Sequence, residues 1–290
     1  MGSPLRPQAR PRDRADSPVL RACAFAVFLV LSAGNVFAQA LDVGAESVEK
    51  YSRCGCDSGN LSYCNDQASK FIDKIDNWHT RKFWYKDANA WNSDLVEDQL
   101  GVGGTDCPYG DNVQILLISG HGGLEDSSFS GYLCKQSGYD FCNFNTGRAF
   151  LGENPGQSNS QNPGRLRFLI LCTCHSVDKT KAPDVWMPVF QRGKDLMYVM
   201  GYTGTSVDSE TTDEVPEDFA RKAAGSKWRL KKAWFWAIED WWADDTGALI
   251  SRGSTEAEAI GNRDHMKLDW DPPSTCGWPP SWAAWSWHGG

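Results

Sequence analysis

The sequence predicts an α/β protein in which helices cover both faces of a mainly parallel β-sheet, a three-layer α/β/α sandwich. Two continuous apolar runs indicate the sheet, at Val113–Ile118 and Phe168–Leu171. Runs of this length, bounded by glycine and polar residues, are typical of strands buried on both faces of a parallel sheet. Helix-like and strand-like segments alternate after the second run, as they do in a doubly wound sheet.

The other elements follow from the spacing of apolar residues along the chain. Leu41–Leu61 is polar and rich in glycine and serine, so we expect a loop held by cysteines. Helical spacing predicts helices or helical turns, and short segments rich in aromatic and β-branched residues predict strands. We expect helices at Asp66–Trp78, Trp91–Leu100, Ala182–Phe190, Pro216–Ala224 and Arg229–Trp242, strands at Lys82–Tyr85 and Leu196–Tyr202, and a β-hairpin inserted between the two buried strands at Ser128–Phe144.

Four regions divide the 290 residues. Residues 1–40 have an arginine-rich start, an apolar core and a small-residue exit, which is the order of a cleaved secretory signal peptide. A cysteine-rich segment (41–65), one large domain (66–266) and a tail rich in tryptophan and proline (267–290) follow. We expect the tail to pack against the domain. No later run is long enough to span a membrane, so the predicted location is secreted or periplasmic, with no stable membrane span after cleavage.

The charge of the chain excludes one class of partner. The net charge is −8, and removal of residues 1–40, with their five arginines and two aspartates, changes it to −11. An acidic surface repels phosphate backbones, so we expect no nucleic-acid partner. The glycine-rich stretch Gly101–Gly104 is not followed by the Lys-Ser/Thr of a phosphate-binding loop. We expect no cofactor.

Nine cysteines follow the signal peptide, and in an oxidising compartment most of them would pair. The odd number leaves at least one thiol, and Cys174 is a candidate for it. Cys134 and Cys142 flank a turn-like stretch, and a bridge between them across a hairpin is one pairing that the sequence allows. A metal cluster has less support, because no C-x-x-C pair has a matching second pair. The sequence does not reveal the partners of three further cysteines, Cys54, Cys56 and Cys64.

A histidine and a cysteine follow the two buried runs, within the strings ISGHG (His121) and CTCHS (Cys174). Because the carboxyl ends of parallel strands lie at one edge of the sheet, we expect the two side chains to meet there. An imidazole beside a thiol can deprotonate it and later protonate a leaving amine. The pair predicts Cys174 as a nucleophile and His121 as its base. The backbone N–H groups of Gly122 and Cys174 would then form an oxyanion hole.

These two strings resemble the histidine and cysteine motifs of the caspase-like cysteine peptidases, and their wording is closest to the metacaspases. The order of the motifs, histidine before cysteine, and their spacing also fit. Leu196–Gly204, Pro216–Ala224 and Trp234–Trp242 resemble an uncharacterised family of secreted bacterial proteins with this fold, and the whole resemblance runs from about Phe83 to Met266. It implies a caspase-like fold and a Cys–His dyad that hydrolyses peptide bonds without a third catalytic carboxylate.

The resemblance leaves the substrate pocket open. Metacaspases carry an aspartate two residues before the nucleophile, where it helps to bind Arg or Lys, and here that position is Cys172. A preference for basic residues is therefore not implied. Acidic residues on loops near the same edge are candidates to replace that aspartate, and we name Asp178 and Asp208, together with Cys172, as possible pocket residues.

Other interpretations stay open for the same residues. Cys172 competes for the nucleophile role, but it directly follows the apolar run and is expected to lie within the strand. His175 is expected to begin the turn after the nucleophile. A zinc site from Cys172, Cys174, His175 and His121 would crowd its ligands at one strand end, so no metal is expected. The leading prediction is an exported cysteine peptidase acting on a protein or peptide. The alternatives are a catalytically inactive caspase-like binding or scaffold protein and a thiol redox protein.

Overall fold

The computed structural model describes residues 39–97, 100–139, 141–152, 164–240, 246–270 and 279–288. The predicted signal peptide as far as residue 38, and one of the nine cysteines, Cys276, lie outside these residues. Among the residues that are described, no helix has the length and apolar character needed to cross a membrane. The account below concerns the unit that spans residues 38–290.

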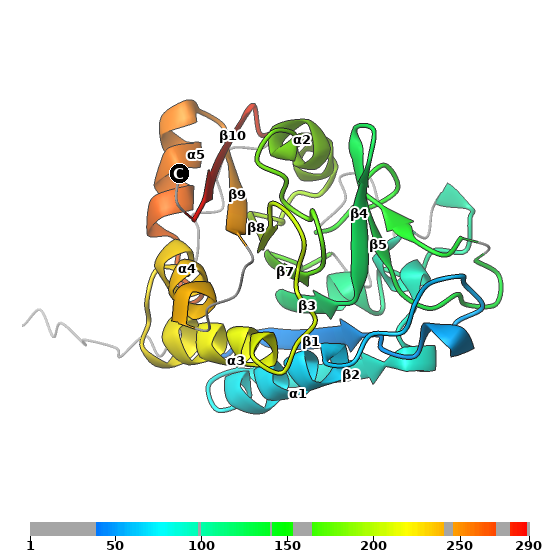
Figure 1. The fold of residues 1–290 in the computed structure, drawn as a ribbon. Helices are drawn as coiled ribbons and strands as arrows, with labels where there is room; N and C mark the ends of the chain where they lie inside the picture. The colour runs from blue at the N-terminus through cyan, green and yellow to red at the C-terminus, as the bar shows by residue number, and fades with distance from the viewer. Residues whose placement is uncertain are drawn as a thin grey trace, which may run out of the picture. The chain divides into compact units, whose positions relative to one another are not determined.

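Seven strands of the described residues form one mostly parallel sheet: β1 (Asp42–Ser47), β2 (Thr80–Lys86), β3 (Ile115–Ser119), β7 (Phe168–Cys172), β8 (Tyr198–Tyr202), β9 (Gly247–Gly253) and β10 (Trp282–Trp287). Their order across the sheet is β10-β9-β8-β7-β3-β1-β2 (Figure 1). The strands from β2 to β8 in this order run parallel to one another. Strand β9 runs antiparallel to both of its neighbours, β8 and β10.

A small antiparallel sheet is inserted between β3 and β7. It consists of β4 (His121–Glu125), β5 (Ser128–Tyr132) and β6 (Phe144–Asn145), in that order. The inserted hairpin was predicted, but it begins seven residues earlier than expected, because His121 already pairs with Tyr132 across it. Gly120 lies between β3 and β4, where the chain passes from the large sheet to the small one.

Five α-helices lie within the described residues: α1 (Cys64–Ile75), α2 (Ala182–Arg192), α3 (Val215–Ala220), α4 (Leu230–Asp240) and α5 (Glu256–His265). Helix α3 continues into a π-helical turn at Arg221–Gly225. Short 3-10 turns occur at Tyr51–Arg53, Asp87–Asn89, Asn92–Leu95, Gly110–Asn112 and Thr212–Glu214. The predicted helices near α1, α2 and α4 are confirmed, and the start of Trp91–Leu100, expected as a helix or helical turn, forms a 3-10 turn at Asn92–Leu95.

Two apolar layers cover the two faces of the large sheet. Alternate residues of β7 serve both layers, since Phe168 and Ile170 pack on the side of α1, α3 and α4, and Leu169 and Leu171 on the side of α2. This double burial explains why the strand is a continuous apolar run. Helices therefore lie on both faces of the sheet (Figure 1). The chain has a mixed α/β fold that is compatible with an α/β/α sandwich.

Two segments that the sequence left irregular belong to the large sheet. Leu41–Leu61 was expected to be a loop, but it contains β1, which pairs with both β2 and β3. A glycine here predicts a loop, but Gly44 lies within β1 and makes room for a neighbouring side chain. An added Cβ there would lie 2.3 Å from the ring of Phe83. At the other end of the chain, Trp282–Trp287 forms the edge strand β10 rather than an irregular tail.

The disulfides correct one prediction. Cys134 and Cys142 do not bridge each other, because Cys134 pairs with Cys54 and Cys142 with Cys56. Both bridges join the segment after β1 to the segment after β5, across separations of 80 and 86 residues. Disulfides of this kind persist in non-reducing surroundings. They indicate an extracellular or periplasmic environment for the chain.

The sheet order marks one edge as the place for a ligand. From β1 the chain goes to β2 on one side, and it then returns to add β3, β7 and β8 on the other. In open α/β sheets, ligands bind beyond the carboxyl ends of the strands where the order reverses in this way. Here that point lies at the ends of β1 and β3, with β7 next to them.

Candidate active site

One cavity of about 230 Å³ lies at this edge, and both His121 and Cys174 line it. His121 comes from the start of β4, just after β3, and Cys174 follows β7 by two residues. Strands β3 and β7 are hydrogen-bonded neighbours in which Ser119 pairs with Cys172. The segments after β3 and β7 leave adjacent parallel strands at the same level. An imidazole and a thiol from distant parts of the sequence therefore reach one cavity.

The turn after β7 holds Cys174 at the carboxyl end of that strand. His175 has a left-handed backbone (φ 55°), which is rare for residues other than glycine, and its N–H donates to the Gly204 carbonyl. The Cys174 thiol faces Ser206, whose backbone N–H donates to Sγ at 3.3 Å. An N–H donor aimed at sulfur stabilises negative charge there. The turn therefore holds the thiol in a fixed and polar contact.

Tyr51 positions the backbone of His121. Its hydroxyl accepts a hydrogen bond from the His121 N–H (2.9 Å) and donates one to the Tyr132 carbonyl (2.6 Å). The rings of Tyr51 and His121 lie 4.7 Å apart between centroids. Gly120 makes this contact possible, since an added Cβ would lie 2.5 Å from the Tyr51 hydroxyl. The buried hydroxyl of Tyr51 thus bridges the two strands of the inserted hairpin, β4 at His121 and β5 at Tyr132.

A backbone carbonyl determines which nitrogen of His121 can act as a base. Nε2 lies 2.8 Å from the carbonyl oxygen of Gly59. A carbonyl oxygen only accepts, so Nε2 must carry the hydrogen in this contact. In the neutral ring Nδ1 is then unprotonated, which is the form a general base requires.

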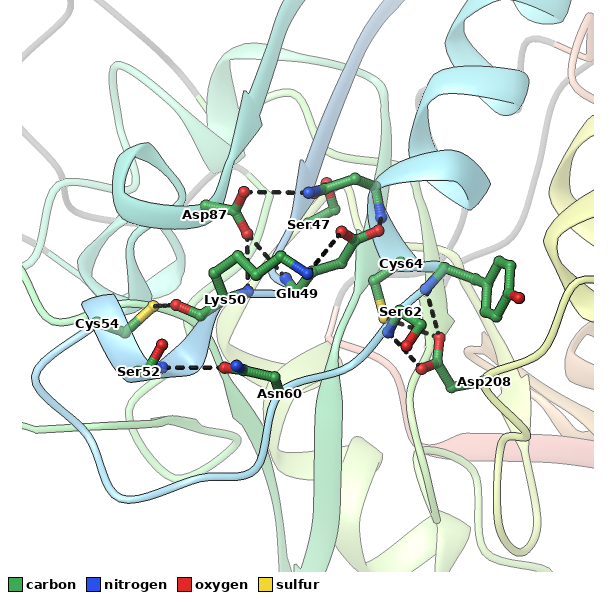
Figure 2. Close-up of polar contacts among 12 residues, drawn as sticks. Ser47, Glu49, Lys50, Ser52, Cys54, Asn60, Ser62, Cys64, Asp87 and Asp208 are labelled. Carbon is green, nitrogen blue, oxygen red and sulfur yellow. Dashed lines mark hydrogen bonds and ion pairs between the residues drawn. The ribbon is translucent and has the colours of Figure 1, made fainter.

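The loop that carries Gly59 is fixed from several sides. Disulfides hold Cys54 and Cys56 before it. After it, the N–H of Leu61 donates to the Glu49 carbonyl at 2.9 Å, and a side-chain oxygen of Asn60 accepts from Ser52 (Figure 2). The cysteine-rich segment therefore contributes directly to the site, by presenting a carbonyl to the histidine.

The glycine after the histidine packs closely against the cysteine turn. An added Cβ at Gly122 would lie 2.8 Å from the carbonyl oxygen of Cys174 and 2.8 Å from the Cβ of Thr173. Any larger residue would push the two strand ends apart. The oxyanion-hole role of the Gly122 and Cys174 N–H groups stays a prediction, for which this close approach is a necessary condition.

Two of the three predicted pocket residues line the cavity, Cys172 and Asp208. Cys172 is the last residue of β7, as expected, and is buried. The third, Asp178, is not among the lining residues. Its carboxylate accepts hydrogen bonds from the N–H and hydroxyl of Thr180. Burial raises the pKa of Asp178, but these hydrogen bonds outweigh it and the pKa is lowered.

Asp208 connects two loops at the cavity. One of its oxygens accepts from the Ser62 N–H (2.6 Å) and the other from the Tyr63 N–H (2.9 Å), just before α1 (Figure 2). The Cys64 thiol lies 4.0 Å from the same carboxylate. A negative charge at a helix start is favourable. Asp208 therefore ties the segment after β8 to the start of α1.

Sequence reasoning missed several residues of the site. Tyr51 and Gly59 lie in the segment that was expected to be a loop, and Cys64 and Gln67 begin α1 at the floor of the cavity. Only the nearby cysteines hinted that this segment is held against the rest of the protein. No group of three or more His, Cys, Asp or Glu within the described ranges is arranged to hold a metal ion.

The fold and site define a class: an α/β protein with a thiol and an imidazole in one cavity at the switch point of a mostly parallel sheet. Residues 45–273 match the model of the family described as Domain of unknown function (DUF6345). This match covers most of the chain, so the chain belongs to that family. A search of curated proteins finds no match.

Proposed function

We propose that this protein is an exported cysteine peptidase of the caspase-like type, with Cys174 as the nucleophile and His121 as the general base. One observation carries the proposal: the two side chains line one cavity at the ends of adjacent parallel strands.

The fold is consistent with the same proposal. The histidine strand and the cysteine strand are neighbours in a mostly parallel sheet, helices lie on both faces, and a hairpin is inserted between the two motifs. The two disulfides support an exported location. The motif resemblance adds the reaction type, peptide-bond hydrolysis.

The proposed chemistry uses the two side chains that line the cavity and two backbone N–H groups beside them. His121 Nδ1 takes the thiol proton as Cys174 Sγ attacks the carbonyl carbon of the scissile bond. The N–H groups of Gly122 and Cys174 would stabilise the negative oxygen that forms. The imidazolium then gives its proton to the leaving amine, and the C–N bond breaks to leave a thioester. Water, deprotonated by the same imidazole, hydrolyses the thioester and regenerates the thiol.

Active-site labelling tests the proposal. The full chain, expressed so that it is exported, is treated with a peptidyl acyloxymethyl ketone, and the modified residue is mapped by mass spectrometry. We expect one thioether, at Cys174, and no labelling in Cys174→Ala. Cys107→Ala is the matched control, because Cys107 does not line the cavity, and it should label normally.

Two outcomes contradict the proposal. Labelling at Cys172 or Cys64 with Cys174 unmodified would show that the assignment of Cys174 as the nucleophile is wrong. No labelling of folded protein by any peptidyl probe would favour the inactive binding or scaffold protein.

A further inference from the structure

We infer that the cavity beside Cys174 binds a small, uncharged and apolar side chain of the substrate, at the residue whose carbonyl is attacked. This inference rests on the proposed function and extends it to specificity. The geometric reason is simple. The attacked carbon must approach Sγ to about 3–3.5 Å, so the side chain on the adjoining Cα must enter whatever hollow lies beside the thiol.

The floor of the cavity is uncharged. Cys64, Gln67 and Cys172 form it, and each is almost fully buried. Burial raises the pKa of the Cys64 thiol, which therefore stays neutral at neutral pH.

The amide of Gln67 is already engaged within the protein. Its oxygen accepts from the Ser119 hydroxyl at 2.5 Å, and its nitrogen donates to the Thr212 carbonyl at 3.4 Å. A polar substrate side chain would have to displace these buried hydrogen bonds, each of which contributes about 1 kcal/mol. The floor thus favours an apolar group over an amide or hydroxyl.

The rim of the cavity includes two aliphatic side chains, Leu61 and Val207. They come from different loops, Leu61 from the disulfide-held segment and Val207 from the segment after β8. No lysine or arginine is among the residues that line the cavity in the described part of the chain. An acidic substrate side chain would therefore find no cation to pair with.

Among the described residues that line the cavity Asp208 is the single carboxylate, and its position does not suit a basic substrate side chain. Both of its oxygens accept backbone N–H groups, from Ser62 and Tyr63. A guanidinium binds a carboxylate best when both oxygens are open to a two-point contact. Here the same two oxygens hold the start of α1. Asp208 therefore does not offer the open two-point contact that a guanidinium prefers.

The test compares acyloxymethyl ketone probes that differ only in the residue next to the reactive group: Ala, Val, Leu, Asp, Lys and Arg. The rate of Cys174 labelling is measured in the full-length exported protein, so peptide turnover is not needed. We expect the best apolar probe to react at least about 10-fold faster than any charged probe, the scale set by one good or bad pocket contact. Faster reaction with the Arg, Lys or Asp probe would overturn the inference.

Variants make the same test sharper. Leu61→Asp adds a carboxylate at the rim, where partial exposure tolerates it, and should raise the labelling rate of the Arg probe relative to the Leu probe by about 10-fold or more. Asp208→Asn should leave the preference unchanged, as should Asp178→Asn, the control outside the cavity. Loss of Arg or Lys labelling in Asp208→Asn alone would show that Asp208 binds a basic side chain, against the inference.

The two proposals fail in different ways. If Cys174 reacts with every class of probe but prefers charged ones, the dyad stands and only the specificity is wrong. If Cys174 reacts with none of them in folded protein, the proposed function itself fails.

Discussion

Single atoms decide the chemistry of the candidate site. The Gly59 carbonyl holds the hydrogen of His121 on Nε2, and a Ser206 N–H points at the Cys174 sulfur. Neither contact involves a charged side chain. Backbone groups, which mutation does not readily remove, therefore contact both members of the proposed dyad. This arrangement agrees with the absence of a third catalytic carboxylate from the motif resemblance.

A buried acidic pair, Glu46 and Asp94, should make the stability of the protein depend on pH. Glu46 lies near the end of β1, and burial raises its pKa well above the usual value, with the nearby Asp94 raising it further. Burial also raises the pKa of Asp94, to about 7. Since the unfolded carboxyls titrate near 4, the folded protein keeps a proton that the unfolded chain releases. The free energy of unfolding should therefore fall as the pH rises from about 4 to about 7.

Replacing one acid should weaken this dependence. We expect Glu46→Gln to raise the free energy of unfolding at pH 7 by about 1–3 kcal/mol, because Asp94 is then the one titratable carboxyl left in the buried pair. Urea unfolding at pH 5 and pH 7 measures the effect, and the difference between the two pH values should shrink. The exposed Glu210→Gln serves as the control. An unchanged pH dependence in Glu46→Gln would show that the pair does not govern stability in this range.

At the scale of elements, the disulfide-held loop both stabilises the fold and contributes residues to the candidate site. It joins β1 to α1, and it carries both the carbonyl that orients His121 and the Leu61 rim of the cavity. Two disulfides anchor it to the segment after β5. We therefore expect the loop to respond to reduction.

The paired variant Cys56→Ser/Cys142→Ser tests this role. Without the bridge the Gly59 carbonyl is less well placed, and small misplacements in a site can cost up to about 100-fold in rate. We expect Cys174 labelling to slow by roughly 10-fold to 100-fold. Circular dichroism must first show that the variant is folded, since loss of a disulfide typically costs about 2–4 kcal/mol. Cys107→Ser is the control. An unchanged labelling rate in the folded double variant would show that the loop does not contribute to the reactivity of Cys174.

At the scale of the whole molecule, the sequence predicted the centre of the sheet better than its edges. The runs Val113–Ile118 and Phe168–Leu171 contain the buried strands β3 and β7, whose apolar character is visible without any partner. Strands β1 and β10 were missed, because Gly44 and Glu46 interrupt one and tryptophans without a regular period fill the other. Their pairing depends on partners far along the chain, which local spacing does not reveal.

The candidate site was also predicted only in part. His121 and Cys174 could be predicted because each follows a recognisable buried strand, and parallel strands end at one edge. Tyr51 and Gly59 could not, because their contacts with His121 cross 70 and 62 residues of sequence and depend on disulfide pairing. A single sequence does not fix that pairing, and the expected Cys134–Cys142 bridge was wrong.

The central claim is that His121 and Cys174 act together, and one comparison tests it most directly. The second-order rate constant for labelling of Cys174 by an apolar acyloxymethyl ketone is measured at neutral pH in the unmodified protein and in His121→Ala. General acid–base groups contribute about 10²–10⁴-fold, so we predict a loss of at least 100-fold. His175→Ala, which alters a neighbouring histidine that does not line the cavity, should retain most of the rate. Equal rates in His121→Ala and the unmodified protein would contradict the dyad.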